Sequence, residues 1–231
     1  MTQDQQKRAA GEAAAALVEA GMAVGLGTGS TAAHFVAALA ARRLDIRCVP
    51  TSEMTAALAR QGGMALTTLE EVRGLDLTVD GADEIGPGLA LIKGAGAALL
   101  REKLVWEASR RCVVIADAGK RVPSLGCGPL PIEVVAFAHA STAARIADVL
   151  AEAGIAAPPV LRLSAGGAPV LTDGGNLIYD VTCGAIPEPR ALGGALKALT
   201  GVVEHGLFLG LAERALVAGD DGVRTILASD A

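Results

Sequence analysis

The chain has 231 residues, of which 52% are hydrophobic and 19% are charged, and its formal net charge is −5 at pH 7. It is long enough for one large domain, or for one domain with a small companion, to bury a full core, and its composition is far from that of a disordered chain. The acidic balance and only five scattered aromatic residues argue against broad binding to nucleic acid or to an anionic membrane surface.

The N-terminal segment predicts a helix and not an export signal. Its first eight residues are polar, and residues 3–19 have the pattern of an amphipathic helix. Residues 20–41 contain no Asp, Glu, Lys or Arg, but eight of these 22 residues are Gly, Ser, Thr or His, most of them in the turn-like GLGTGST. We therefore expect no signal peptide, no membrane span and a cytoplasmic location.

Four cysteines occur, and their spacing gives no metal or disulfide pattern. Cys48, Cys112, Cys127 and Cys183 are far apart and form no CxxC or Cys/His ligand motif. We expect reduced thiols, as in a cytosolic protein.

Apolar strand-like runs alternate with helical stretches through the first half of the chain. The expected order is a helix at 3–19, a strand at 22–26, a helix at 31–41, a strand at 46–50, a helix ending near 61, a strand at 75–79, a helix from about 96 and a strand at 112–117. Continuous apolar strands between helices are typical of a parallel sheet that is buried on both faces. The predicted fold class is α/β, with a Rossmann-like open, mostly parallel sheet carrying helices on both faces.

The chain changes character after Pro123, where proline and glycine become frequent. A helix around 141–153 and β-like segments at 160–164 and 177–182 predict a smaller α+β domain at roughly 126–200, inserted toward the C-terminal half. The segments RALVAG and VRTIL are expected to rejoin the first sheet. Residues 1–125 with 201–231 would then form the Rossmann-like catalytic domain.

The stretch GLGTGSTA, residues 25–32, follows a strand and opens a helix. Backbone N–H groups and the positive end of the helix can converge on an anion there, so the pattern favours phosphate binding. A plain tight turn remains possible. So does a dinucleotide site, because GxGxxA is a weak fingerprint, with Asp45 and Glu53 as the acids near the ribose-binding distance.

The stretch VDGADE, residues 79–84, begins at the carboxyl end of a predicted strand, where open α/β sheets bind ligands. Asp80 and Asp83 can face one pocket. A metal site is an alternative, although the nearby Lys93 can supply the positive charge of a metal. The acids could also be turn formers, with Glu84 as a solvated charge or cap.

The stretch KGAGAALLREK, residues 93–103, carries Glu102 into an apolar helix. At about 100° per residue, Glu102 falls among Ala98, Leu99, Val105 and Trp106, and Lys103 falls on a more polar edge. Loss of hydration raises the pKa of a carboxyl group toward that of a useful general base. A surface or salt-bridged Glu, paired for example with Arg101, is the alternative. Lys120, in a loop after the strand at 112–117, is a candidate for substrate binding or an ordinary exposed lysine.

With these stretches in place, the sequence closely resembles the type A family of ribose-5-phosphate isomerases. The resemblance covers nearly the whole chain. The matching motifs follow in family order: GLGTGSTAAHF, VDGADEI, IKGAGAALLREK, ADAGK, PLPIEV, DGGNLIYDV and GVVEHGLF.

The resemblance implies roles for individual residues. Glu102 would be the proton acceptor, Asp80 and Asp83 would handle ring opening and proton movement between sugar oxygens, and Lys93 would stabilise the oxyanion. The substrate-binding residues would be Lys7, Thr28, Gly29, Ser30, Thr31, Asp80, Gly81, Ala82, Asp83, Lys93, Gly94, Ala95, Gly96 and Lys120. Ala95 departs from the family, where many members carry glycine.

The implied reaction is the interconversion of D-ribose 5-phosphate and D-ribulose 5-phosphate through an enediolate, in the non-oxidative pentose phosphate pathway. No cofactor and no metal ion are implied, and the expected partners are the sugar phosphate substrate and further copies of the chain in a homodimer or higher assembly. A sugar-phosphate sensor, or another sugar-phosphate isomerase or deaminase on the same fold, is the alternative.

Overall fold

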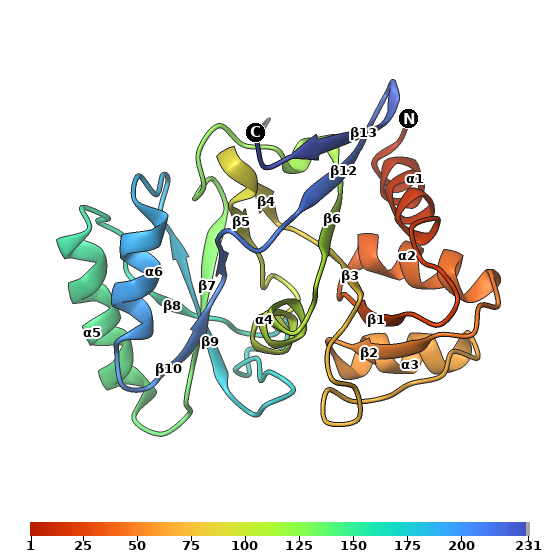
Figure 1. The fold of residues 1–231 in the computed structure, drawn as a ribbon. Helices are drawn as coiled ribbons and strands as arrows, with labels where there is room; N and C mark the ends of the chain where they lie inside the picture. The colour runs from red at the N-terminus through yellow and green to blue at the C-terminus, as the bar shows by residue number, and fades with distance from the viewer. Residues whose placement is uncertain (230–231) are drawn as a thin grey trace. The chain divides into compact units, whose positions relative to one another are not determined.

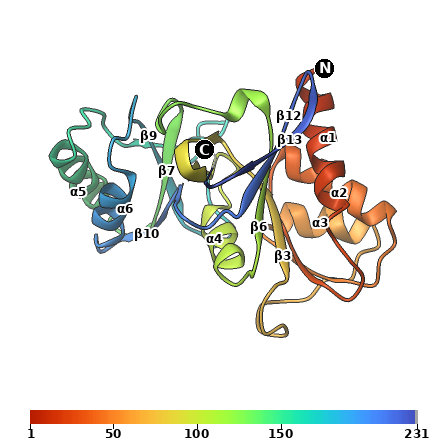
Figure 2. The same cartoon turned by 45° about the horizontal axis from the view of Figure 1, so that its top comes forward.

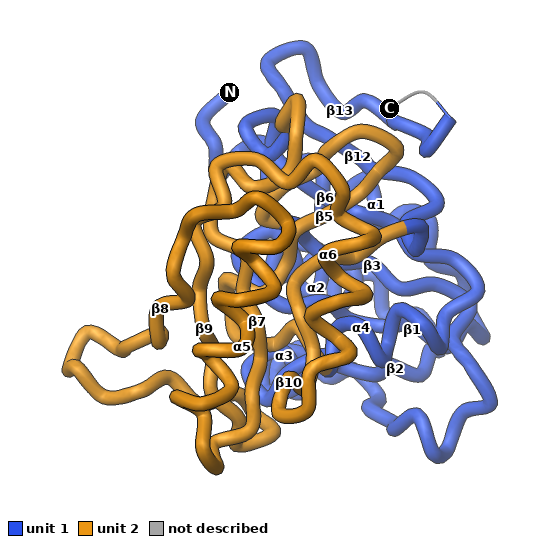
Figure 3. Tube along the Cα trace, turned by 90° about the vertical axis from the view of Figure 1, so that its left-hand side faces the viewer, with its two compact units in different colours: residues 1–82, 101–121, 210–231 blue, residues 83–100, 122–209 orange. Residues whose placement is uncertain are grey.

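The structure is a computed structural model of the protein, and it describes residues 1–229. The chain forms two compact units (Figure 3). Unit 1 contains residues 1–82, 101–121 and 210–229, and unit 2 contains residues 83–100 and 122–209.

Unit 1 is built on a six-stranded sheet with the strand order β13-β12-β6-β3-β1-β2 (Figure 1). The strands are β1 (Ala23–Leu26), β2 (Arg47–Pro50), β3 (Leu77–Gly81), β6 (Cys112–Asp117), β12 (Arg214–Gly219) and β13 (Gly222–Leu227). All neighbours run parallel except β12 and β13, which are antiparallel. The Rossmann-like, mostly parallel sheet is confirmed, and so is the return of RALVAG and VRTIL to it.

Helices cover both faces of this sheet (Figure 2). The helices are α1 (Gln3–Ala15), α2 (Ser30–Ala41), α3 (Glu53–Gln61) and α4 (Leu99–Glu107). Val24 of β1 packs with Phe35 of α2 in the main core, whereas Ala23 packs with Val105 of α4 in a separate cluster. Since successive strand residues point to opposite faces, α2 and α4 lie on opposite sides of the sheet. A Cβ on Gly25 would lie 2.7 Å from Val105 Cγ1, so glycine at this position lets α4 pack closely.

Local chemistry sets where the helices begin and end. Thr2 and Gln5 form a capping box at the start of α1. This helix ends at Ala15, four residues before the predicted end. After Ala15 the hydrogen bonds join residues three positions apart, since Val18 N–H donates to the Ala15 carbonyl at 3.2 Å. The Arg42 guanidinium also donates to the carbonyls of Ala15 and Val18. Helix α4 begins at Leu99 and not near residue 96, because Ala97 has a left-handed backbone with φ 56°.

Unit 2 has an α+β organisation. Its four-stranded antiparallel sheet has the order β10-β7-β9-β8 and a three-stranded sheet has the order β11-β5-β4. Residues Ile146 of α5 and Leu192 of α6 pack against Ile132 of β7 in the core of this unit. The elements of unit 2 are β4 (Glu84–Ile85), β5 (Leu91–Ile92), β7 (Pro129–Val134), α5 (His139–Glu152), β8 (Val160–Leu161), β9 (Leu177–Thr182), α6 (Pro189–Lys197), β10 (Val202–His205) and β11 (Leu207–Phe208).

The units divide the chain at different places from the predicted domain boundaries near 126 and 200. Residues 83–100 belong to unit 2 because β4 and β5 pair with β11. Residues 201–209 also belong to unit 2, because β10 pairs with β7. Helix α6 was not expected from the sequence, since Gly193 and Gly194 lower its intrinsic helix propensity.

Candidate active site

The carboxyl ends of β1 and β3 meet at the point where the strand order of the first sheet reverses. The chain passes from β1 to β2 on one side and then crosses to β3 on the other side. Open α/β sheets bind ligands at such a point. Thr28, which follows β1, donates its backbone N–H to Asp80 Oδ1 of β3 at 3.0 Å. The GTGST loop and the first acid of VDGADE are therefore in direct contact.

Asp80 is fully buried, and N–H groups surround its carboxylate. Oδ1 accepts hydrogen bonds from Thr28 N–H and from its neighbour Gly81 N–H, at 3.0 and 2.7 Å. Oδ2 accepts from the indole Nε1 of Trp106, on α4, at 3.3 Å. Hydrogen bonds of this kind fix the orientation of the carboxylate. Trp106 was not predicted as a site residue, although it is the only tryptophan and lies one helical turn after Glu102.

The loop after β1 has the features of an anion site. Gly29 has φ 112°, in the left-handed region, and precedes α2 without offering a capping side chain. The first N–H groups of α2 and its positive end are thus left for a ligand. Lys7 of α1 reaches this loop, since its Nζ donates to Ser30 Oγ at 3.1 Å. Thr31 is buried at the start of α2.

Glu102 lies on α4 and is buried, with 4% of its surface exposed. The predicted apolar sector around it is confirmed, because Ala98, Leu99, Val105 and Trp106 are all buried. The alternative of a surface glutamate is wrong. Lys103 is buried as well, so α4 has less of a polar edge than its helical wheel predicts.

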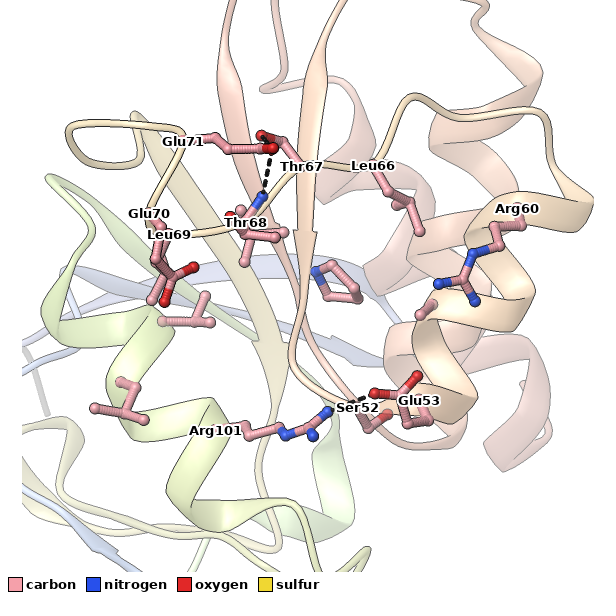
Figure 4. Close-up of a pocket in the computed structure, with 15 residues that line it drawn as sticks. Ser52, Glu53, Arg60, Leu66, Thr67, Thr68, Leu69, Glu70, Glu71 and Arg101 are labelled. Atoms are coloured by element: carbon pink, nitrogen blue, oxygen red, sulfur yellow. Dashed lines mark hydrogen bonds and ion pairs between the residues drawn. The ribbon is translucent and has the colours of Figure 1, made fainter. Parts of the chain in front are cut away.

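The neighbouring Arg101 extends from α4 toward Glu53 of α3 (Figure 4). Its Nη1 pairs with Glu53 Oε1 at 2.9 Å. This ion pair also engages Glu53, one of the two acids considered for a dinucleotide ribose. The pair borders a cavity of about 640 Å³ between α3, the loop at 66–71 and α4. None of the residues predicted to bind substrate or to act in catalysis lines this cavity.

Lys120 closes the 3₁₀ turn Ala118–Lys120, directly after β6. Asp117 holds the turn, because its Oδ1 accepts from Gly119 N–H at 3.1 Å. The side chain of Lys120 is partly exposed, on the same sheet edge as the carboxyl end of β3.

Ala82 is the last residue of the unit 1 segment that contains β3, and the remaining predicted residues belong to unit 2, where Asp83 organises the KGAG segment. Its Oδ2 accepts from Ala95 N–H at 2.9 Å. Lys93 is 2% exposed, and its Nζ lies 5.5 Å from the centroid of the Phe208 ring. Gly94 needs its left-handed φ of 113° and has no room for a Cβ beside Leu99. Ala95 is exposed, which leaves space for the methyl group that a glycine would lack.

Two residues of unit 2 that were not in the predicted site set fix loops of this unit. Arg162 donates from Nη1 to the carbonyls of Gly94 and Ala95, at 2.9 and 3.1 Å. Glu84 is buried, and its carboxylate accepts from Gly126 N–H at 2.7 Å and from Gly128 N–H. The expectation of a solvated Glu84 is wrong, and the carboxylate instead fixes the loop that enters β7.

Among residues 1–229, no group of three or more His, Cys, Asp or Glu side chains could hold a metal ion. None of the helices in the same range has the length and apolar character needed to cross a bilayer.

Comparisons with known proteins agree with the motifs. The family model for ribose 5-phosphate isomerase A (phosphoriboisomerase A) matches residues 47–222. A ribose-5-phosphate isomerase A of Caulobacter sp. strain K31 is 68% identical over 223 residues, which are 96% of this chain and 98% of the relative.

Solved structures of similar proteins have the same fold over nearly their full length. The ribose 5-phosphate isomerase A of Neisseria gonorrhoeae has a TM-score of 0.90 at 35% identity and covers 98% of both chains. A D-ribose-5-phosphate isomerase in complex with phospho-erythronic acid has a TM-score of 0.91 at 35% identity, over 98% of this chain and 100% of the other. The chain described here therefore belongs to the ribose-5-phosphate isomerase A family.

Proposed function

We propose that this protein is an aldose-ketose isomerase that interconverts D-ribose 5-phosphate and D-ribulose 5-phosphate, in the non-oxidative pentose phosphate pathway. The observation that carries the proposal is the 68% identity to a ribose-5-phosphate isomerase A over almost the whole of both chains. The buried carboxylate of Glu102 in the matching motif fits this chemistry, because the reaction moves a proton between neighbouring carbons.

In the proposed reaction Glu102 removes the proton from carbon 2 of the open-chain aldose and returns it to carbon 1. The electron pair of the broken C–H bond forms the enediolate, whose oxygen charge is stabilised by the ammonium group of Lys93. A positioned general base contributes about a hundredfold to ten-thousandfold in rate, and one preorganised electrostatic contact contributes roughly 3 to 4 kcal/mol. This scheme uses side chains alone, with no metal ion and no cofactor.

The two aspartates have different surroundings, which refines the roles that we propose for them. Asp83 is partly exposed and serves ring opening and the proton movement between the sugar oxygens. Asp80 is fully buried and accepts three N–H hydrogen bonds, so it chiefly holds the substrate loop in place.

The phosphate group is proposed to bind at the start of α2, where Lys7 is the cation that reaches Ser30. Lys120 is proposed as a further substrate contact. The substrate-binding set comprises Lys7, Thr28, Gly29, Ser30, Thr31, Asp80, Gly81, Ala82, Asp83, Lys93, Gly94, Ala95, Gly96 and Lys120. The complex of a similar isomerase with phospho-erythronic acid supports a phosphorylated polyhydroxy ligand.

The test is an isomerase assay on purified protein with a metal chelator present and no added nucleotide. We expect ribulose 5-phosphate to form from ribose 5-phosphate, and no ammonia to be released from glucosamine 6-phosphate. Lack of turnover in protein that is folded by circular dichroism would refute the proposal.

We further propose a homodimer or larger homo-oligomer in the cytoplasm. Large apolar side chains are exposed on unit 2, with Phe137 at 89%, Val160 at 60% and Leu171 at 60% of their surface, which favours contact with a further chain. Light scattering coupled to size-exclusion chromatography tests the assembly, and a monomer at micromolar concentration would contradict it. Cell fractionation tests the location.

A further inference from the structure

Four hydroxyl groups are buried together under the loop that follows β1. Thr28 Oγ1 lies 2.7 Å from Thr51 Oγ1, 2.8 Å from Ser52 Oγ and 3.1 Å from Thr55 Oγ1. All four residues are at most 7% exposed. The last three come from the turn between β2 and α3 and from the first turn of α3, more than twenty residues after Thr28 in the sequence. We name Thr51, Ser52 and Thr55 the hydroxyl cluster.

Each hydroxyl group of the cluster already donates its proton in a hydrogen bond. Thr51 donates to the Leu26 carbonyl and Thr55 donates to the Gly27 carbonyl, each at 3.0 Å. Ser52 donates to Thr55 Oγ1, also at 3.0 Å. A hydroxyl group carries a single proton. The proton of Thr28 is therefore the one shared with the cluster, and it points toward Thr51 and Ser52.

The backbone of Thr28 is also turned inward, because its N–H donates to Asp80 Oδ1. Neither donor of Thr28 is thus directed at an anion in front of the loop, so Thr28 belongs to the proposed substrate-binding set through its place in the loop and not through a donated hydrogen bond. The donors left for a phosphate are the N–H groups that follow Gly29, together with Ser30 and Lys7.

The geometry points to Thr51 and Thr55 as positioning residues for the anion-binding loop, acting through Thr28 and the carbonyl groups of Leu26 and Gly27. Thr51 also donates its backbone N–H to Leu26 O at 2.9 Å, so this carbonyl is held twice. The inference deepens the proposed function, because it assigns the residues that set the geometry of the proposed phosphate site. Their removal should weaken phosphate binding equally in the ground state and the transition state.

The experiment compares Thr55→Val and Thr51→Val with the hydroxyl-retaining variants Thr55→Ser and Thr51→Ser. The measurements are KM and kcat for ribose 5-phosphate, and the dissociation constant of inorganic phosphate by calorimetry. Each valine variant should raise KM and the phosphate dissociation constant by the same factor, about fivefold or more, with kcat nearly unchanged. The serine variants, which keep the hydroxyl group, should have the KM and the phosphate dissociation constant of the wild type.

The matched control is Thr142→Val, which removes another buried hydroxyl group, 2% exposed, from unit 2. It should leave phosphate binding unchanged even if the melting temperature falls. Unchanged phosphate affinity in folded Thr55→Val or Thr51→Val, or an equal loss in Thr142→Val, would overturn the inference. If the wild-type protein is inactive but binds phosphate, the isomerase proposal is refuted. The positioning role of Thr51 and Thr55 is then still decided by the phosphate dissociation constants of the variants.

Discussion

Arg162 and Asp180 form a two-pronged ion pair, in which Nε and Nη2 of the guanidinium donate to the two carboxylate oxygens at 2.7 and 2.5 Å. The third nitrogen, Nη1, is thereby aimed at the carbonyls of Gly94 and Ala95. The pair is only 15% and 25% exposed. Asp180 thus orients Arg162, and Arg162 in turn holds the backbone of Gly94 and Ala95, which follow Lys93.

We predict that Arg162→Met leaves the protein folded but lowers kcat/KM by about tenfold or more. Hydrogen bonds to charged groups contribute about 1.5 to 3 kcal/mol each, and loss of these bonds loosens the segment that presents Lys93. Steady-state kinetics check the effect. Arg224→Met is the control, because the pair of Arg224 with Asp221 is 73% and 81% exposed and should contribute little. Wild-type kinetics for Arg162→Met would contradict the positioning role.

Glu102→Gln should lower kcat by about a hundredfold or more, because an amide cannot accept the proton. Binding of inorganic phosphate should change little. The control is Glu107→Gln, an exposed glutamate at the end of the same helix. Retained activity in Glu102→Gln would move the base elsewhere, with the Asp80 to Asp83 loop as the next candidate.

Gly27→Ala should damage the contact between the loop and β3. A Cβ at this position would lie 2.1 Å from Asp80 Oδ1 and 2.5 Å from Asp80 Cα, so the backbone of one strand end must move. We expect the free energy of unfolding to fall by about 1 to 3 kcal/mol, together with a loss of activity. Urea titration measures the change.

The control for this variant has the opposite expected sign. A Cβ on Gly194, in α6, would meet nothing within 4 Å. Gly194→Ala should therefore stabilise the protein by about 0.5 to 1 kcal/mol, since alanine is the better helix former. Equal stability losses in both variants would show that the crowding at Asp80 is not the cause.

Alkaline pH should destabilise the fold through its buried thiols. Burial raises the pKa of Cys48 and of Cys112 to about 12, whereas an unfolded cysteine titrates near about 8.5. Above that value the unfolded chain loses protons that the folded chain keeps. The stabilising contribution is therefore complete below about pH 8.5 and falls by about 1.4 kcal/mol per pH unit for each thiol as the pH rises toward the folded pKa.

Urea unfolding at about pH 8 and about pH 10 measures this dependence. The double variant Cys48→Ala with Cys112→Ala should show a shallower pH slope than the wild type. Cys127→Ala should keep the wild-type slope, because that thiol is exposed. Equal slopes in all three proteins would contradict the prediction.

The sequence was sufficient to predict the parallel sheet and the burial of Glu102, because both follow from local periodicity. Continuous apolar strands indicated the sheet, and helical angles placed Glu102 among apolar neighbours. Helix α6 was missed because its two glycines obscure the helical signal. The grouping of residues 83–100 with unit 2 has no local signal, because it depends on the pairing of β5 with β11, more than one hundred residues later.

The support of the candidate site could not be predicted in the same way. The contacts of Asp80 with Trp106, of Thr28 with Thr55 and of Gly94 with Arg162 join residues 26, 27 and 68 positions apart. No periodicity or spacing rule connects such positions. Glu84 is buried although a solvated charge was expected, because its partners are backbone N–H groups more than forty residues away in the sequence.

The contact between Trp106 and Asp80 also has an optical consequence. Trp106 is the only tryptophan in the sequence and is 1% exposed. All tryptophan fluorescence of this protein therefore originates from an indole whose N–H touches the carboxylate beneath the substrate loop. A shift in that emission on adding phosphate or sugar phosphate would report rearrangement at Asp80 directly, without an introduced label.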